Sequence, residues 1–315
     1  MGAGRSVTPT AAERRARPAG VAVAAGRSRG APGRHRAVER YSHEGLHFEL
    51  DDLGEPGGEP VVLLHGFPQD RSAWSAVAPQ LVSAGYRVLA PDQRGYSPGA
   101  RPLERRAYRL AALARDVVAL ADAAGAGRFH VVGHDWGALV AWRLAATTFS
   151  RVASLAALSV PHPRAMAAAV TRPEQALRSW YVAAFQLPGV ERAFAAAGAG
   201  ALAAGLRRSG LGPDEASRYA ARLADPAAAR GALAWYRALP LSSLSSTPAV
   251  SVPTLQIWGR RDPFVSRAAA DASAEWVTGP LRTLTLEAGH WLPERHAGEV
   301  GAALVDHLRS AGGAS

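Results

Sequence analysis

The stretch Phe129-His130-Val131-Val132-Gly133-His134-Asp135-Trp136-Gly137 decides the fold of this chain. Residues 129–132 predict a buried strand, and residues 138–145 predict a helix that follows it. Between them, two glycines flank Asp135, which is the pattern of a nucleophile held on a sharp turn between a strand and a helix. The usual residue at this position is serine. Serine attacks a carbonyl carbon, whereas a carboxylate attacks an alkyl carbon. The expected intermediate is therefore an alkyl ester and not an acyl-enzyme.

Outward from this stretch, short apolar runs alternate with longer amphipathic ones, which is typical of an α/β fold. We expect strands at residues 46–50, 61–64, 87–90, 129–132, 152–160, 254–258 and 281–286. We expect helices at residues 74–84, 110–124, 138–145 and 299–308. Asp51-Asp52-Leu53-Gly54 is expected to form the turn after the first strand, and Pro79 disfavours a regular first half of helix 74–84.

Between Pro161 and Val250 the chain is Ala-rich and helical in pattern, with no clear strand. An all-helical insertion between two strands of a parallel sheet is most simply a cap over the carboxyl ends of the strands, where ligands bind in open α/β sheets. The predicted organisation is therefore an α/β core formed by residues 41–160 and 251–315, a helical cap at 161–250 and a tail at 1–40.

The tail concentrates the basic charge of the chain. The formal net charge is +10, but residues 1–40 hold nine arginines and only Glu13 and Glu39 as acids, so the rest of the chain is nearly balanced. We expect residues 1–40 to be a disordered Arg-, Ala-, Gly- and Pro-rich tail; a basic arm and a misassigned start codon are the alternatives. No nucleic-acid partner is implied for the core.

Composition excludes several kinds of site. The chain has no cysteine, so disulfides, thiolate metal sites and a cysteine nucleophile are excluded. It also has no lysine, which excludes a Schiff base and a Walker-type phosphate loop. The histidines lack the spacing of metal ligands, so no metal and no cofactor are expected. No apolar run reaches the ~20 residues that span a bilayer, and we expect a cytoplasmic monomer or homodimer.

An elbow nucleophile requires a base, an acid that orients the base, and an oxyanion hole. His290 follows the last expected strand and Asp262 follows the strand before it, in the order nucleophile, acid, base. Glu287 and Asp271 compete with Asp262 for the role of the acid. The backbone N–H groups of Phe67 and Trp136 are the expected oxyanion donors.

Four motifs together resemble the α/β-hydrolase fold epoxide hydrolases: His-Gly-Phe-Pro at 65–68, Gly-His-Asp-Trp-Gly at 133–137, the late Asp262, and Gly-His-Trp at 289–291. The resemblance covers nearly everything from Tyr41 onward. It implies an α/β-hydrolase fold, a mostly parallel sheet flanked by helices, with the helical cap inserted between two late strands. Residues 180–190 and 234–237 resemble the cap segments that carry two ring-opening tyrosines, which implies that Tyr181 and Tyr236 protonate the epoxide oxygen.

The implied reaction converts a small epoxide and water to a vicinal diol. Asp135 attacks a ring carbon, and His290, oriented by Asp262, activates the water that hydrolyses the ester. A phenol with a pKa of about 10 is protonated at neutral pH and can donate to the opening oxygen. Phe67, Trp136 and His162 are candidates for binding the substrate, whereas His65 and His134 are expected to be structural hydrogen-bonding residues.

A haloalkane dehalogenase is the main alternative, because it shares the aspartate nucleophile and Trp136 can donate to a halide. Such enzymes typically have asparagine where this chain has Phe67, and they lack the two cap tyrosines. A fluoroacetate-type dehalogenase usually has arginine after the aspartate, and a His-Trp pair where this chain has Tyr181-Val182. A non-catalytic member of the fold usually lacks a triad residue, and none is missing here.

Overall fold

A sheet of eight strands forms the centre of the computed structural model, which describes residues 1–2 and 37–312. The strands are β1 (Arg40–His43), β2 (Leu46–Leu53), β3 (Glu59–Leu64), β4 (Tyr86–Pro91), β5 (Phe129–His134), β6 (Val152–Leu158), β7 (Thr254–Gly259) and β8 (Leu281–Leu286). Their order in the sheet is β1-β2-β4-β3-β5-β6-β7-β8. β1, β2 and β4 pair antiparallel, and all other neighbours pair parallel, as expected for the predicted fold class.

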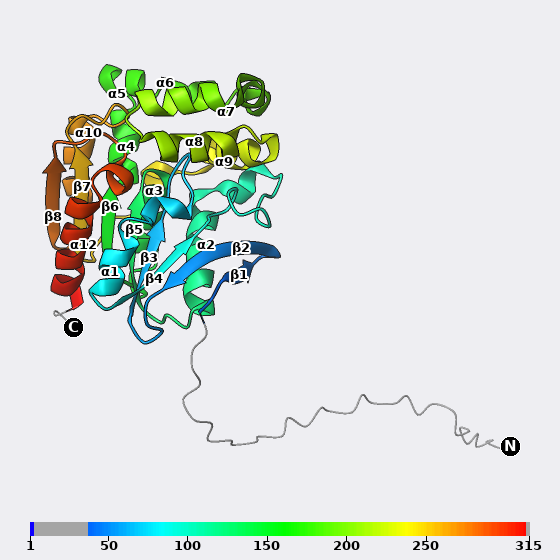
Figure 1. Ribbon diagram of the computed structural model, residues 1–315. Coiled ribbons are helices and arrows are strands. Elements are labelled where there is room, and N and C mark those ends of the chain that lie inside the picture. The colour runs from blue at the N-terminus through cyan, green and yellow to red at the C-terminus, as the bar shows by residue number, and fades with distance from the viewer. Residues whose placement is uncertain (3–36, 313–315) are drawn as a thin grey trace. The chain divides into compact units, whose positions relative to one another are not determined.

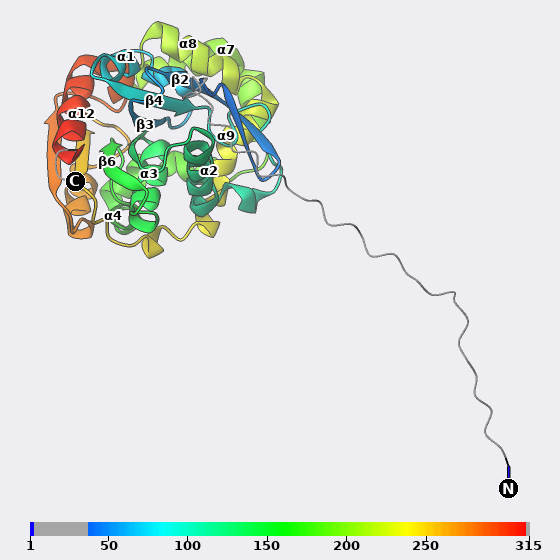
Figure 2. The same cartoon turned by 90° about the horizontal axis from the view of Figure 1, so that it is seen from below.

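Helices cover both faces of this sheet (Figure 2). They are α1 (Ala78–Ser83), α2 (Leu110–Ala123), α3 (Trp136–Thr147) and α12 (Ala297–Gly312). Successive strand residues point to opposite faces, so Val62 and Leu64 of β3 pack in the core cluster of α2 and α3. Val61 and Leu63 pack in the cluster of α1 and α12. The central strands are buried on both faces, which explains their nearly continuous apolar sequence.

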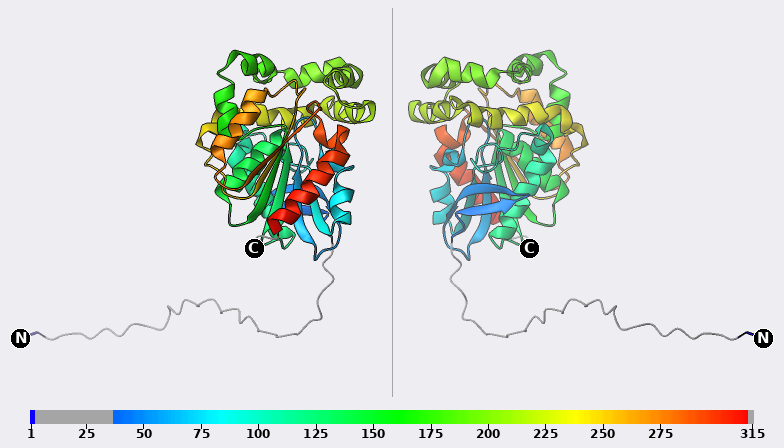
Figure 3. Two further views of the ribbon diagram at one scale, coloured as in Figure 1. Left: turned by 90° about the vertical axis from the view of Figure 1, so that its left-hand side faces the viewer. Right: turned by 90° about the vertical axis from the view of Figure 1, so that its right-hand side faces the viewer.

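The segment between β6 and β7, called the helical insertion below, contains six α-helices. They are α4 (Pro163–Ala169), α5 (Pro173–Arg178), α6 (Trp180–Ala184), α7 (Val190–Arg208), α8 (Pro213–Leu223) and α9 (Pro226–Ala238). Figures 1 and 3 show α5 to α9 stacked at one end of the sheet. α9 approaches the core closely, because a Cβ at Gly231 would lie 2.2 Å from the carbonyl oxygen of Gly95.

The structure differs from the sequence prediction at β2. Residues 51–53 continue the strand instead of forming a turn, since they pair with residues 88–90 of β4. The carboxylate of Asp52 accepts hydrogen bonds from Nε and Nη2 of Arg87 at 2.9 and 2.7 Å. The prediction was wrong because acidic residues are rare in strands. The cation that stabilises Asp52 in this strand is Arg87, which belongs to the neighbouring strand β4.

The expected helix at residues 74–84 is also divided. Residues 71–74 form a 3-10 turn (Arg71–Trp74), capped by Asp70, whose side chain accepts from the backbone N–H of Ser72. α1 then begins at Ala78, with Pro79 in its first turn, where the missing N–H leaves no hydrogen bond unmade. The sequence identified Pro79 as the point of irregularity.

Most of the expected tail, residues 3–36, lies outside the described residues. At its end, Arg40 is the first residue of β1 and pairs with Glu49 of β2. Within the part of the chain that the structure describes, no helix is both long enough and apolar enough to cross a membrane.

Candidate active site

Asp135 occupies a strained turn between β5 and α3. Its φ of 53° and ψ of −120° are uncommon for a residue with a side chain. The two flanking glycines permit this turn, because a Cβ at Gly133 would lie 2.2 Å from Gly137 O and a Cβ at Gly137 would lie 2.1 Å from Leu64 O. The sequence pattern is thus a steric requirement for bringing the carboxylate to the end of the sheet.

His290 and Asp262 lie beside Asp135. His290 follows β8 and Asp262 follows β7, so both side chains reach the sheet end that carries Asp135. His290 Nε2 is 3.5 Å from Asp135 Oδ2, and His290 Nδ1 is 2.7 Å from Asp262 Oδ2. The other oxygen of Asp262 accepts from the backbone N–H groups of Phe264 and Val265 at 2.8 and 3.1 Å. These bonds fix the carboxylate that orients the imidazole.

The charges of this group depend on one another. Burial by itself would lower the pKa of His290, but the carboxylates of Asp262 and Asp135 outweigh burial and raise that pKa to about 10. Burial would raise the pKa of Asp135, yet the nearby His290 and the Phe67 N–H hold it below its usual value. Each of these two groups therefore favours the charged form of the other, carboxylate for Asp135 and imidazolium for His290.

The backbone N–H of Phe67 donates to Asp135 Oδ1 at 2.7 Å. The opposite end of the same peptide unit, Gly66 O, lies 3.0 Å from Nδ1 of the buried His65. His65 Nε2 accepts from the backbone N–H of Gln93 at 3.1 Å, which leaves the proton of a neutral ring on Nδ1. Burial lowers the pKa of His65, consistent with that neutral form. His65 thus orients the Phe67 N–H toward Asp135.

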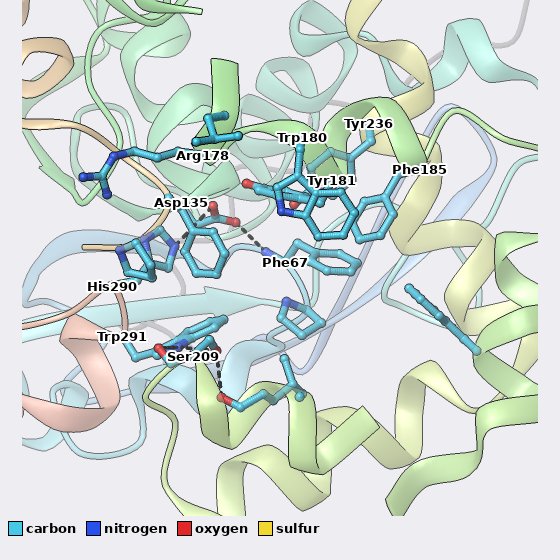
Figure 4. A pocket seen from close by; sticks show the side chains of 17 residues that line it. Phe67, Asp135, Arg178, Trp180, Tyr181, Phe185, Ser209, Tyr236, His290 and Trp291 are labelled. Carbon is cyan, nitrogen blue, oxygen red and sulfur yellow. Dashed lines mark hydrogen bonds and ion pairs between the residues drawn. The ribbon is translucent and has the colours of Figure 1, made fainter. Parts of the chain in front are cut away.

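The helical insertion supplies Tyr181 from α6 and Tyr236 from α9. Their ring centroids are 6.0 Å apart, and Figure 4 shows both on the other side of Asp135 from His290. Burial and then the Asp135 carboxylate raise the pKa of Tyr181. Burial, followed by Tyr181 and Asp135, raises that of Tyr236. Both phenols therefore remain protonated donors at neutral pH.

Two cavities, of about 630 and 530 Å³, meet around Asp135, His290 and the two tyrosines. The residues that line both are Asp135, Trp180, Tyr181, Tyr236, Phe264 and His290. Beyond them the first cavity continues past Phe67, Phe185 and Trp291, and the second past Trp136, Leu139 and Met166. The Asp135 carboxylate is therefore reached from two cavities, and the walls of both are mainly apolar.

The structure does not bring His162 to these cavities. His162 is buried at the start of α4, where its Nδ1 accepts from Arg164 N and its Nε2 lies 3.0 Å from Pro248 O. Its ring lies against Trp142 and Trp276. These contacts hold the first turn of the insertion. Trp136 lines the second cavity and begins α3, next to Asp135.

Sequence reasoning missed two buried polar groups beside the site, those of Gln69 and Glu294. Each lies four residues after a motif histidine, Gln69 after His65 and Glu294 after His290, and this spacing was the only available signal. Gln69 Nε2 donates to Glu294 Oε1 at 2.6 Å. Among the described residues, no group of three or more His, Asp or Glu side chains is arranged to hold a metal ion.

Comparisons with known proteins show which proteins this chain resembles. Residues 59–297 match the family model described as alpha/beta hydrolase fold. Epoxide hydrolase A of Mycobacterium tuberculosis is 36% identical, over 84% of this chain and 94% of that protein. AB hydrolase superfamily protein YfhM of Bacillus subtilis is 34% identical, over 84% and 96%. The crystal structure of Epoxide Hydrolase A from Mycobacterium thermoresistibile has 33% identity and a TM-score of 0.72, and covers 87% of this chain and 97% of that one.

Proposed function

The chain belongs to the α/β-hydrolase fold epoxide hydrolase family and is an epoxide hydrolase, and on this premise we propose how its residues perform the reaction. Asp135 attacks one ring carbon, the bond from that carbon to the ring oxygen breaks, and Tyr181 or Tyr236 donates a proton to that oxygen. The observation that carries this proposal is the position of Asp135, between a histidine held by Asp262 and the phenols of the partly buried Tyr181 and the buried Tyr236. The product of this first step is a hydroxyalkyl ester on Asp135.

Water then hydrolyses the ester. His290 takes a proton from the water, whose oxygen adds to the carboxyl carbon of Asp135, and the Phe67 and Trp136 N–H groups stabilise the resulting oxyanion. Collapse breaks the bond to the diol oxygen, which receives the proton from His290, and the second proton of water restores the tyrosine. The Phe67 N–H already lies 2.7 Å from Asp135 Oδ1, which supports this role.

The first step prepares the second through charge. Esterification removes the negative charge of Asp135, which is one of the two carboxylates that raise the pKa of His290. That pKa therefore falls, the imidazolium releases a proton to solvent, and a base becomes available after the ester has formed. His290 takes a proton back from solvent when hydrolysis restores the Asp135 carboxylate. The same charge raises the pKa values of Tyr181 and Tyr236, so both phenols become stronger acids as the nucleophile is consumed.

The shape of the site favours a particular class of epoxide. Because mainly apolar cavities reach Asp135 from two sides, we propose a substrate with an apolar substituent on each ring carbon. The side chain of Phe67 has no hydrogen-bond donor for a halide, and its ring packs against Phe185 and Tyr236. The missing donor disfavours the dehalogenase alternative.

Single turnover in heavy-oxygen water tests the covalent route. The proposal expects label in the Asp135 carboxylate, whereas label found only in the diol contradicts it. A panel of terminal and trans-disubstituted aryl epoxides, with halide release from 1-bromobutane measured in parallel, tests the substrate class. We expect the highest kcat/KM for a disubstituted epoxide; halide release without diol formation would favour the dehalogenase.

A further inference from the structure

The buried carboxyl group of Glu294 joins three parts of the molecule. Glu294 lies in α11 (Leu292–Arg295), four residues beyond His290. Its Oε1 accepts one hydrogen bond from Nε2 of the fully buried Gln69, at 2.6 Å, and another from the hydroxyl of Tyr219 in α8, at 3.0 Å. One oxygen atom thus receives a donor from the loop after β3 and a donor from the helical insertion.

Gln69 extends this contact to the reacting groups. Its Oε1 accepts from the backbone N–H of Gly66 at 2.7 Å and lies 2.9 Å from His134 Nδ1. Gly66 immediately precedes Phe67, whose N–H faces Asp135. The other ring nitrogen of His134 lies 2.9 Å from the carbonyl oxygen of His290. The orientation of the Gln69 amide therefore bears directly on the segment that carries the oxyanion donor. Its link to His290 runs through His134, whose pKa burial lowers to about 4, so this neutral ring has one proton for the two oxygens that face it.

The amide of Gln69 can hold this position only while its oxygen has a hydrogen-bond donor and its nitrogen has an acceptor. The Gly66 N–H is a fixed donor and requires the oxygen end. The nitrogen end then needs an acceptor, and Glu294 Oε1 is that acceptor. Without it, a buried N–H group would lack a partner, and this favours rotation of the amide away from Gly66.

We propose that Glu294, acting through Gln69, is a positioning residue for ester hydrolysis, which is the second half of the reaction. The hydrogen bond from Tyr219 connects Glu294 to the helical insertion. The proposal rests on the proposed function, because it requires an ester on Asp135. Gln69, Glu294 and Tyr219 do not themselves contact Asp135 or the two tyrosines. The Phe67 N–H also holds the Asp135 carboxylate before ring opening, but the oxyanion that most needs this donor forms only during ester hydrolysis. Ester hydrolysis depends on the Phe67 N–H and on His290. The cluster is connected to these two groups through Gly66 and His134.

The test is the fraction of enzyme that carries the ester at steady state. After rapid mixing with styrene oxide and acid quench, mass spectrometry of the peptide containing Asp135 gives this fraction. Glu294→Ala and Gln69→Ala are each expected to slow ester hydrolysis about tenfold to hundredfold, which is at most the effect of losing an oxyanion donor. The rate of ester formation is expected to change less than about threefold. The ester should therefore accumulate in both variants.

Two conservative variants separate positioning from packing. Glu294→Gln keeps an accepting oxygen for Gln69 and Tyr219 and should hydrolyse the ester at nearly the wild-type rate. Tyr219→Phe keeps the ring buried and removes one donor, so it should raise the ester fraction less than Glu294→Ala does. It also keeps the proposal testable if Glu294→Ala does not fold. Glu299→Ala, which changes an exposed carboxylate on α12, is the matched control.

His290→Gln shows whether an ester forms at all. If this variant accumulates the ester but folded Glu294→Ala, Gln69→Ala and Tyr219→Phe do not, the positioning role is overturned and the covalent route stands. A loss of thermal stability with equal slowing of both steps would also overturn it, because a purely structural role has that effect. If no variant, His290→Gln included, carries an ester, the covalent route fails, and this proposal fails with it.

Discussion

His290 Nε2 lies 3.5 Å from Asp135 Oδ2, so the imidazole faces the carboxylate directly. The distance is longer than a good hydrogen bond but short enough for a strong charge interaction in a buried site. Each residue therefore sets the protonation of the other. In the proposed ester of Asp135, His290 loses this charged partner and keeps only Asp262.

Asp135→Asn should lower the pKa of His290 from about 10 by roughly 1–3 units, because the variant removes one of the two facing carboxylates. Asparagine also tolerates the positive φ at this turn, so the fold should be kept. Histidine ¹³C NMR titration of both proteins measures the shift. An unchanged pKa would show that Asp135 does not set the charge of the base.

The same variant should change how stability depends on pH. The folded pKa of His290 lies above its ordinary value of 6.5, so its stabilising contribution is fully present below pH 6.5 and is lost as pH rises through about 10. In Asp135→Asn the loss should end at a lower pH. Urea unfolding at intervals between pH 6 and 10.5 measures the difference, and parallel curves for the two proteins would refute it.

Asp262→Asn should slow ester hydrolysis about a hundredfold to ten-thousandfold, because an amide holds the His290 tautomer and charge less well than a carboxylate. Ester formation should change much less. Single-turnover kinetics resolve the two steps. Asp271→Asn is a suitable control, because Asp271 is an exposed residue paired with Arg267.

Tyr181→Phe and Tyr236→Phe should each slow ring opening about tenfold to hundredfold, and the double variant by more than either alone, because each removes a proton donor to the leaving oxygen. The aromatic contacts of both rings would be retained. The rate of ester formation is the measurement. Equal rates in the double variant and the wild type would remove both tyrosines from the mechanism.

Gly231→Ala should destabilise the protein by about 2 kcal/mol or more, since its Cβ would lie 2.2 Å from Gly95 O and force α9 away from the core. Ring opening should also slow, because α9 carries Tyr236. Gly200→Ala in α7 is the control: its Cβ meets no atom within 4 Å, and helix propensity favours alanine by about 0.5–1 kcal/mol. Thermal unfolding of both variants provides the comparison.

Local patterns in the sequence were sufficient where a residue's role depends on its neighbours in the chain. The last strand, residues 281–286, was predicted with its observed bounds, and the turn at Asp135 followed from its two glycines. Residues 51–53 were assigned wrongly because their strand depends on pairing with β4 and on Arg87, far away in the chain.

By itself, the sequence determined the α/β core, the insertion of helices between two late strands, and the set of candidate residues, because strand periodicity, the glycine pattern and motif order are local properties. Only the tertiary structure decided which buried groups meet. It placed His162 in packing at the start of α4 and brought Gln69, Tyr219 and Glu294 onto one oxygen atom. Such contacts join segments separated by more than seventy residues, so no local pattern encodes them. They form because buried polar groups need hydrogen-bond partners, and only the folded chain brings those partners together.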